Sequence, residues 1–253
     1  MTHPASGRYL TLTTDGGEAE AYLVGSPDRP GVLLFIDAIG LRPQIERMAD
    51  RIASWGYTVL APNVFWRDGT AAELAPRTDL RAPGNREAFM PGAMKRVAAL
   101  TPAQVAADFP VWHAALREHS AADSAIGVTG YCMGGRLSLR FAATYPAEVA
   151  VTGMFHAGGI VVDGADSPHL VAPDVAARVV AGFADNDRSA TPEQVAAFNA
   201  ALTASGVTFT SVIYPDAPHG YTMADTSTYQ EAGAERHFTE LRGALDSGID
   251  SAL

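Results

Sequence analysis

The chain has 253 residues, 47% of them hydrophobic, so it can bury one large core, and we expect residues 1–253 to form a single domain. A formal net charge of −10, with acidic residues spread along the chain, argues against a surface for nucleic acid or an anionic membrane and favours a small-molecule partner. With one cysteine, no stretch of membrane-spanning length and no leader-like segment, the sequence predicts a soluble cytoplasmic protein, a monomer or a small homo-oligomer.

The first quarter of the chain predicts strands alternating with a helix. Residues 8–13 and 18–24 alternate in polarity around a Gly-Gly turn, which is typical of a hairpin at a sheet edge. Residues 31–36 are continuously apolar, as in a strand buried on both faces, and residues 57–61 form a second such strand. Between them, residues 43–54 have a helical period with apolar side chains on one face.

Residues 63–101 interrupt this alternation. They contain several prolines and glycines and a high share of the arginines of the chain, including Arg67, Arg77, Arg81, Arg86 and Arg96. A connection of this length in a compact domain is usually functional or disordered. We expect an insertion that covers the site, and a merely solvated insertion is the alternative.

The alternation resumes after residue 101. The pattern predicts a helix at 102–119, an elbow strand and helix within 126–139, strands at 149–155, 178–183 and 207–214, a helix starting at Thr191 and a closing helix at 229–245. Alternating strands and helices indicate an α/β protein with a mostly parallel central sheet and helices on both faces. Ligands of such sheets bind at the carboxyl ends of the strands.

The stretch that organises the rest is the segment IGVTGYCMGGRLSL, residues 126–139. It has the G-x-nucleophile-x-G pattern of a nucleophile elbow, with Cys132 in the place where serine is more usual. At the N-terminus of the following helix, the helix dipole favours both a thiolate and an adjacent oxyanion. The alternative is that a lone cysteine in a glycine-rich turn is a small buried hydrophobic residue.

A thiol nucleophile needs a base, and the base needs a carboxylate to orient it. In α/β-hydrolases these residues occur in the order nucleophile, acid, histidine, each after an inner strand. Cys132, the pair Asp185 and Asp187, and His219 occur in that order and in such positions. His156 also follows an inner strand, and we interpret it as a wall residue of the site.

Three motifs give the chain a resemblance to a known family. The elbow GYCMGG, the acid loop GFADND followed by TPE, and YPDAPHGY are similar to those of the dienelactone hydrolases (carboxymethylenebutenolidases), cysteine hydrolases of the α/β-hydrolase fold. The resemblance runs from about residue 31 to the C-terminal helix. Aligning the acid loop without gaps brings Pro192-Glu193 into register and assigns the acid to Asp187, with Asp185 as the alternative.

The resemblance implies further site residues. Asp37 occupies the position of an acidic residue, glutamate in the dienelactone enzymes, that is implicated in controlling the resting thiol. Ala38 and Met133 occupy the positions whose backbone N–H groups form the oxyanion hole. We also assign Tyr131, His156 and Tyr221 to the substrate pocket.

One departure from the family concerns the substrate. The dienelactone enzymes have an arginine shortly after the catalytic histidine that binds the substrate carboxylate, whereas this chain has the sequence YTMA there, at residues 221–224. Methionine cannot make a bidentate contact to a carboxylate. We therefore expect no strong requirement for a carboxylate, unless an arginine within 63–101 replaces the missing one.

The sequence thus predicts a cysteine-dependent hydrolase of esters or lactones that works through an acyl-thioester on Cys132. We expect no cofactor and no metal. A thioesterase or peptidase with the same triad is one alternative, and a non-catalytic α/β-hydrolase-fold binding protein is another.

Overall fold

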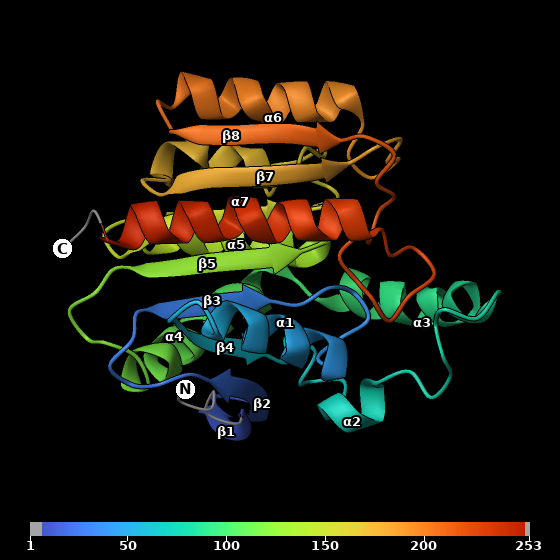
Figure 1. Cartoon of the computed structure of the whole chain (residues 1–253), viewed down its shortest axis with the longest axis horizontal. Coiled ribbons are helices and arrows are strands. Elements are labelled where there is room, and N and C mark those ends of the chain that lie inside the picture. Colours follow the sequence, from blue (N-terminus) through green and yellow to red (C-terminus); the bar gives the residue numbers. More distant parts are fainter. Residues whose placement is uncertain (1–6, 251–253) are drawn as a thin grey trace.

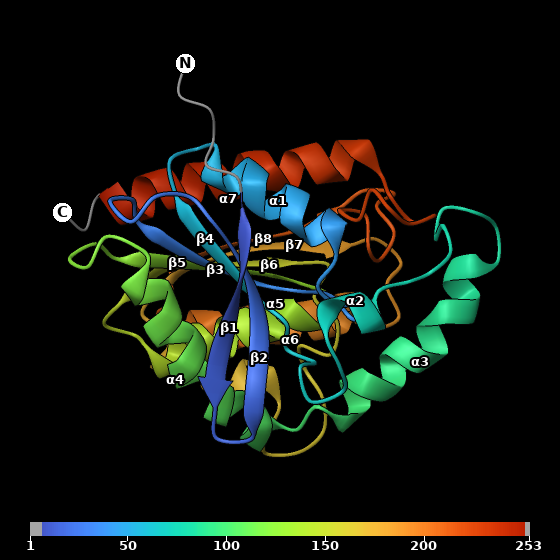
Figure 2. The ribbon, with the colours of Figure 1, turned by 90° about the horizontal axis from the view of Figure 1, so that it is seen from below.

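The computed structural model describes residues 7–250, which build one eight-stranded sheet between two layers of helices (Figures 1 and 2). The strand order is β1-β2-β4-β3-β5-β6-β7-β8. The strands are β1 (Arg8–Thr14), β2 (Gly17–Val24), β3 (Gly31–Phe35), β4 (Thr58–Pro62), β5 (Ile126–Tyr131), β6 (Val149–Phe155), β7 (Arg178–Ala184) and β8 (Phe209–Tyr214). Strands β3 to β8 run parallel to one another, whereas β2 runs antiparallel to both of its neighbours, β1 and β4. The predicted α/β class and the edge hairpin are confirmed.

Helices cover both faces of the sheet. Helices α1 (Pro43–Ala53) and α7 (Glu231–Asp250) lie on one face, and α4 (Pro102–Glu118), α5 (Met133–Thr144) and α6 (Pro192–Ala204) lie on the other (Figure 2). A 3-10 helix, η1 (Pro168–Asp174), packs against α5 and α6. No helix among residues 7–250 is both long and apolar enough to cross a membrane.

The core follows from the apolar patterns of the sequence. Every residue of β3 is buried, as expected for a strand covered on both faces. Aromatic side chains from α4 and α5 pack on its Phe35, with ring centroids 5.7 Å away for Trp112 and 5.9 Å away for Phe141. Trp112 therefore lies on the face that α4 turns toward the sheet.

Residues 63–101 form two helices that the sequence analysis did not predict, α2 (Ala71–Leu74) and α3 (Asn85–Ala99). Helix α3 has Pro91 in its interior, and Ala93 is its only buried residue. The helix was not predicted for two reasons. Proline next to glycine normally indicates a turn, and a helix without a continuous apolar stripe shows no clear helical period of apolar residues in its sequence. Figure 2 shows α3 lying along the side of the sheet where the parallel strands end.

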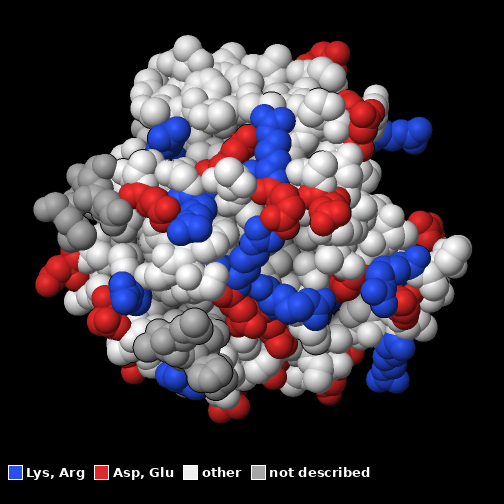
Figure 3. Space-filling model, in the orientation of Figure 1, with Lys and Arg blue, Asp and Glu red and all other residues white. Residues whose placement is uncertain are grey.

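Charged side chains of both signs are interspersed on the face seen in Figure 3, which includes the outer surface of α7. Several of them form pairs between elements, such as Arg51 of α1 with Glu235 of α7, whose charged atoms are 2.6 Å apart. These exposed pairs contribute little stability, about 0–1 kcal/mol each. They show how α1 and α7 lie side by side on this face.

Candidate active site

Cys132 stands between β5 and α5 in a strained backbone conformation, with φ 56° and ψ −119°. Positive φ is rare for a residue with a side chain and is often found at functional sites. The turn requires the glycines on either side. A Cβ at Gly130 would lie 2.0 Å from the Gly134 carbonyl oxygen, and a Cβ at Gly134 would lie 2.5 Å from the Phe35 carbonyl oxygen. The segment therefore has the geometry of a nucleophile elbow.

His219 and Asp187 lie at the ends of two other strands and contact each other directly. The distance from His219 Nδ1 to Asp187 Oδ2 is 2.6 Å. The other carboxylate oxygen of Asp187 accepts hydrogen bonds from the backbone N–H and the hydroxyl of Ser189, at 2.8 and 2.7 Å. This contact at Nδ1 leaves His219 Nε2 for its hydrogen bond with Cys132.

The charges of this group favour an ion pair between sulfur and imidazole. Burial disfavours the Cys132 thiolate, but the charge and hydrogen bond of His219 outweigh it, so the pKa of Cys132 is lowered. Burial also disfavours the imidazolium, yet the thiolate and Asp187 together raise the pKa of His219 to about 10. Burial disfavours the Asp187 carboxylate, but the hydrogen bond and charge of His219 together with the hydrogen bonds from Ser189 outweigh it, so the pKa of Asp187 is lowered.

Asp185, the alternative acid, hydrogen-bonds to backbone groups of two loops and not to His219 in the described residues. Its two carboxylate oxygens accept hydrogen bonds from the backbone N–H groups of Asn186 and Asp216, at 2.9 and 3.0 Å. Asp185 thus ties the loop after β7 to the turn after β8, and the structure places Asp187 rather than Asp185 against His219.

Of the two backbone positions expected to form the oxyanion hole, Met133 is at the elbow and Ala38 follows β3. Ala38 lines the same cavity as Cys132. The N–H of Met133 donates a hydrogen bond to the Cys132 sulfur. The Met133 N–H thus contacts the sulfur, and Ala38 borders the cavity into which that sulfur faces.

Asp37 lines the same cavity as Cys132, and Arg42 binds its carboxylate. Arg42 Nη1 and Nη2 donate to Asp37 at 2.7 and 3.1 Å, and Arg42 Nε donates to Asp225 at 2.6 Å. Arg42 Nη2 also lies 3.4 Å from the sulfur of Met223, the residue found where the family arginine is expected. Arg42 was not predicted as a site residue, since its partner Asp225 is 183 positions away in the sequence.

Of the three residues assigned to the substrate pocket, His156 lines the cavity with Cys132 and His219. Its ring centroid is 5.2 Å from that of His219, and its Nε2 is 2.8 Å from the hydroxyl of Thr222. Burial and the nearby His219 hold the pKa of His156 well below its usual value, so the ring is neutral.

The structure does not bring Tyr131 and Tyr221 to the cavity. Both side chains are fully buried. The hydroxyl of Tyr131 lies 3.2 Å from His237 Nε2, and that of Tyr221 donates to the Gly182 carbonyl at 2.9 Å. Each tyrosine is adjacent to a cavity residue in the sequence, but its side chain points into the core.

The cavity at Cys132 is small, about 30 Å³, and α3 closes one side of it with Arg86 and Met90. Arg86 is half-buried, and in the described part of the chain no carboxylate forms an ion pair with it. Among residues 7–250 no three His, Cys, Asp or Glu side chains are grouped so that they could hold a metal ion.

Comparisons with known proteins identify the family of the chain. The model of the dienelactone hydrolase family matches residues 19–245. A protein from Yersinia pestis described as a putative carboxymethylenebutenolidase is 24% identical over 93% of this chain and 86% of its own length. One from Methylorubrum extorquens with the same description is 27% identical over 84% of this chain and 70% of its own length. The crystal structure of a putative dienelactone hydrolase from Klebsiella pneumoniae superposes with a TM-score of 0.80 at 23% identity, covering 95% of this chain and 98% of that one. With a family match across nearly its whole length and the same α/β-hydrolase architecture, the chain belongs to the dienelactone hydrolase family.

Proposed function

We propose that this chain hydrolyses carboxylic esters or lactones through an acyl-thioester on Cys132, with His219 as general base and acid and Asp187 as the orienting carboxylate. The family supports the class of reaction. The single observation that carries the mechanism is the continuous chain of contacts from the Cys132 sulfur through His219 to Asp187. A protein that only bound ligands would have no need for a strained cysteine held by such a chain of contacts.

In the first half of the reaction, the Cys132 thiolate attacks the carbonyl carbon. The negative charge that develops on the carbonyl oxygen is stabilised by the N–H groups of Ala38 and Met133. The C–O bond of the ester then breaks, and the imidazolium of His219 donates its proton to the departing oxygen. The product of this half is an acyl group in thioester linkage to Cys132.

In the second half, a water molecule attacks the thioester. His219, now neutral, accepts a proton from this water, and the C–S bond breaks to release the carboxylic acid and the thiolate. Asp187 holds the tautomer of His219 through Nδ1 in both halves. His156 stays neutral beside this pair, so it does not compete for the transferred proton.

Cysteine chemistry limits the range of good substrates. A thiolate leaves more easily than an alkoxide, so the tetrahedral intermediate returns to substrate unless the departing oxygen is stable as an anion. Enolates and phenolates meet this condition. Enol lactones and aryl esters are therefore the preferred substrates, ahead of simple alkyl esters, amides and peptides.

Arg86 changes the expectation about a substrate carboxylate. Arg42 cannot bind one, because Asp37 and Asp225 already occupy its guanidinium. Arg86 lines the cavity without an ion-pair partner in the described residues, so it supplies a positive charge close to Cys132. We propose that a carboxylate-bearing enol lactone is favoured over an uncharged lactone of the same size, and that Arg86 makes the difference.

A substrate panel with wild type and Cys132→Ala tests the proposal. The panel contains an enol lactone with and without a carboxylate, a 4-nitrophenyl ester, an alkyl ester, an acyl-coenzyme A thioester and a peptide amide. We expect turnover of the lactones and the aryl ester by wild type only, and an acyl adduct on Cys132 by mass spectrometry. Activity of Cys132→Ala within tenfold of wild type would overturn the mechanism. A preference for the thioester or the amide would reassign the substrate class.

A further inference from the structure

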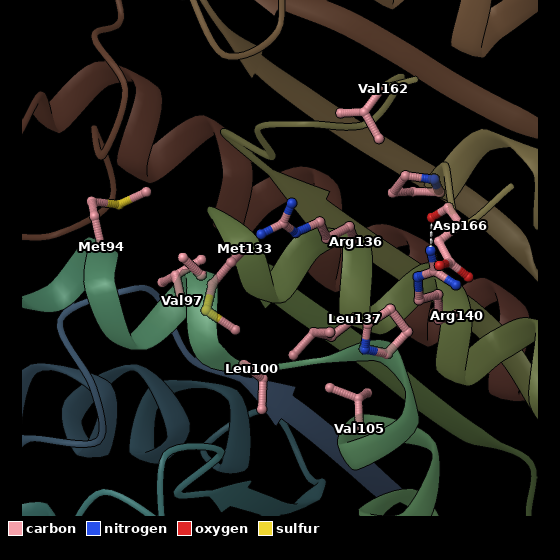
Figure 4. A pocket seen from close by; sticks show the side chains of 13 residues that line it. Met94, Val97, Leu100, Val105, Met133, Arg136, Leu137, Arg140, Val162 and Asp166 are labelled. Atoms are coloured by element: carbon pink, nitrogen blue, oxygen red, sulfur yellow. Dashed lines mark hydrogen bonds between the residues drawn. The ribbon is translucent and has the colours of Figure 1, made fainter. Parts of the chain in front are cut away.

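A second cavity, of about 320 Å³, lies against Met133, the residue that follows the nucleophile. Figure 4 shows it between α3, the start of α4, α5 and the loop that precedes η1. Its volume is at the lower end of the ~300–1,000 Å³ typical of small-molecule sites. The side chains that line it have no part in the reaction proposed above.

One wall of this cavity is apolar. Side chains from α3, α4 and α5 form it, namely those of Met94, Val97, Leu100, Val105, Met133 and Leu137 (Figure 4). Most large apolar side chains of the described residues are buried. Met94 of this wall and Val162, which lines the cavity from the loop before η1, are exceptions, with 48% and 45% of their surface exposed. Contact of such exposed apolar surface with water is unfavourable, by about 25 cal/mol per Å². An apolar ligand would cover this surface.

The opposite side carries two arginines from consecutive turns of α5, Arg136 and Arg140 (Figure 4). Like charges four residues apart on a helix repel each other. Within residues 7–250 no carboxylate forms an ion pair with either of them. Arg140 donates instead to the backbone carbonyl of Asp166, and the Asp166 carboxylate is exposed at the rim.

The guanidinium of Arg136 lies close to the backbone of Gly159, in the loop after β6. A Cβ at Gly159 would lie 2.9 Å from Arg136 Nη1, so the guanidinium packs against bare backbone. Burial lowers the pKa of Arg140, and the charge of Arg136 lowers it further against the opposing effect of Asp166. An anion next to both guanidinium groups would relieve this repulsion.

We propose that this cavity is a binding site for a hydrophobic carboxylate, such as a medium-chain fatty acid. The apolar chain lies along the wall formed by Val97, Val105 and Leu137, and the carboxylate binds Arg136 with Arg140 beside it. An uncharged apolar molecule would cover the wall but leave the two arginines without an anion. A small anion would pair with the arginines but leave the wall exposed.

The proposed site is separate from the catalytic cavity. Cys132 lines one cavity and Met133 the other, and on α3 Met90 lines one and Met94 the other, with no lining residue in common. Occupation of the second cavity therefore does not require a free thiol at Cys132. Binding of a carboxylate in the second cavity and hydrolysis at Cys132 can therefore be tested independently, because either can fail without the other.

Isothermal titration calorimetry with octanoate tests the site on the whole protein. We expect one octanoate to bind per chain to wild type, and equally well after Cys132 has been blocked with iodoacetamide. Arg136→Gln should weaken binding at least about tenfold, because it removes a charge-assisted hydrogen bond. The matched control Lys95→Gln removes a positive charge from an exposed position of α3 that does not line the cavity. It should bind octanoate as wild type does.

The melting temperature of Arg136→Gln shows whether this variant folds. If it folds poorly, two further measurements still test the octanoate site. Met94→Glu places a negative charge at the half-exposed mouth and should also weaken octanoate binding about tenfold or more. The uncharged analogue 1-octanol should bind wild type at least about tenfold more weakly than octanoate does. Absence of octanoate binding at millimolar concentration would overturn the proposal. Loss of octanoate binding after alkylation of Cys132 would also overturn it, because octanoate would then lie in the catalytic cavity. Equal binding of octanoate and octanol would overturn it as well.

Discussion

Arg42 binds Asp37 through both of its terminal nitrogens, at 2.7 and 3.1 Å, with the two side chains only 2% and 6% exposed. This pair lies beside the nucleophile, and the negative charge of Asp37 raises the pKa of Cys132 while His219 lowers it. Arg42 therefore reduces an electrostatic effect that would otherwise disfavour the thiolate. Asp37, the residue expected to control the resting thiol, thus has its own negative charge partly neutralised by the buried Arg42.

The first prediction concerns this arginine. Arg42→Gln leaves Asp37 buried without its cation, so the pKa of Cys132 should rise and alkylation by iodoacetamide at pH 7 should slow. Breaking a buried ion pair by removing one partner costs about 3–5 kcal/mol, so the free energy of unfolding should fall by about that amount. Asp225→Asn is the control, since it keeps the pair of Arg42 with Asp37 and should leave the alkylation rate within about twofold. An unchanged alkylation profile in Arg42→Gln would contradict this account.

The second prediction distinguishes the two aspartates of the acid loop. Asp187→Asn cannot hold the tautomer of His219, and the equivalent change costs ~10⁴ in kcat for a serine triad. Asp185→Asn should lower kcat less than about tenfold and act mainly on stability, because its two hydrogen bonds are to backbone N–H groups of the adjoining loops. The measurement is kcat with a 4-nitrophenyl ester, beside the melting temperature. The opposite ranking of the two variants would reject Asp187 as the acid.

The third prediction concerns the pH dependence of the thiol. The pKa of Cys132 is lowered and that of His219 is raised to about 10, so the ion pair exists between these two pKa values and is lost as the pH falls through the lower one. In wild type the alkylation rate should therefore reach its plateau below the ordinary cysteine pKa, ~8.5. In His219→Ala the profile should move to higher pH.

The control for this profile is His119→Ala, at the end of α4, since His119 lines no part of the cavity. It should titrate as wild type does. Coincident profiles for wild type and His219→Ala would show that the imidazole does not stabilise the thiolate.

Local sequence patterns were sufficient to predict the strands, most helices and the elbow. Buried strands such as β3 are continuously apolar, and the capping box of Thr191 and Gln194 begins α6 where proline indicated a helix start. The ungapped alignment of the acid loop pointed to Asp187, the aspartate that contacts His219. The motifs carry this information because their residues are close together in the chain.

Features made by distant residues could not be predicted in this way. The pairing of Arg42 with Asp225 and the closure of the catalytic cavity by Arg86 and Met90 depend on loops that meet only in the folded chain. Tyr131 was assigned to the pocket, but its side chain lies in the core, because successive side chains of a strand point to opposite faces. Helix α3 was missed since its stability does not come from a continuous apolar stripe.

The last prediction concerns the narrow catalytic cavity. A cavity of about 30 Å³ leaves little room beside Cys132, so we expect Met90, which lines it, to shift when an ester substrate binds. Overpacking of this kind typically costs ~1–3 kcal/mol. Met90→Ala should remove part of that cost for a bulky acyl group and almost none for a small one. We therefore expect the ratio of kcat/KM for 4-nitrophenyl butyrate to that for 4-nitrophenyl acetate to rise about fivefold or more.

The matched control for this change is Met94→Ala, one helical turn further along α3. Met94 lines the second cavity and not the one at Cys132, so its truncation should leave the ratio of the two esters unchanged. Using a ratio cancels any loss of folded protein, because both esters report on the same active molecules. A rise of similar size in both variants would mean that α3 moves as a unit and that Met90 has no specific contact with the acyl group. No rise in either would show that the acyl group lies away from α3.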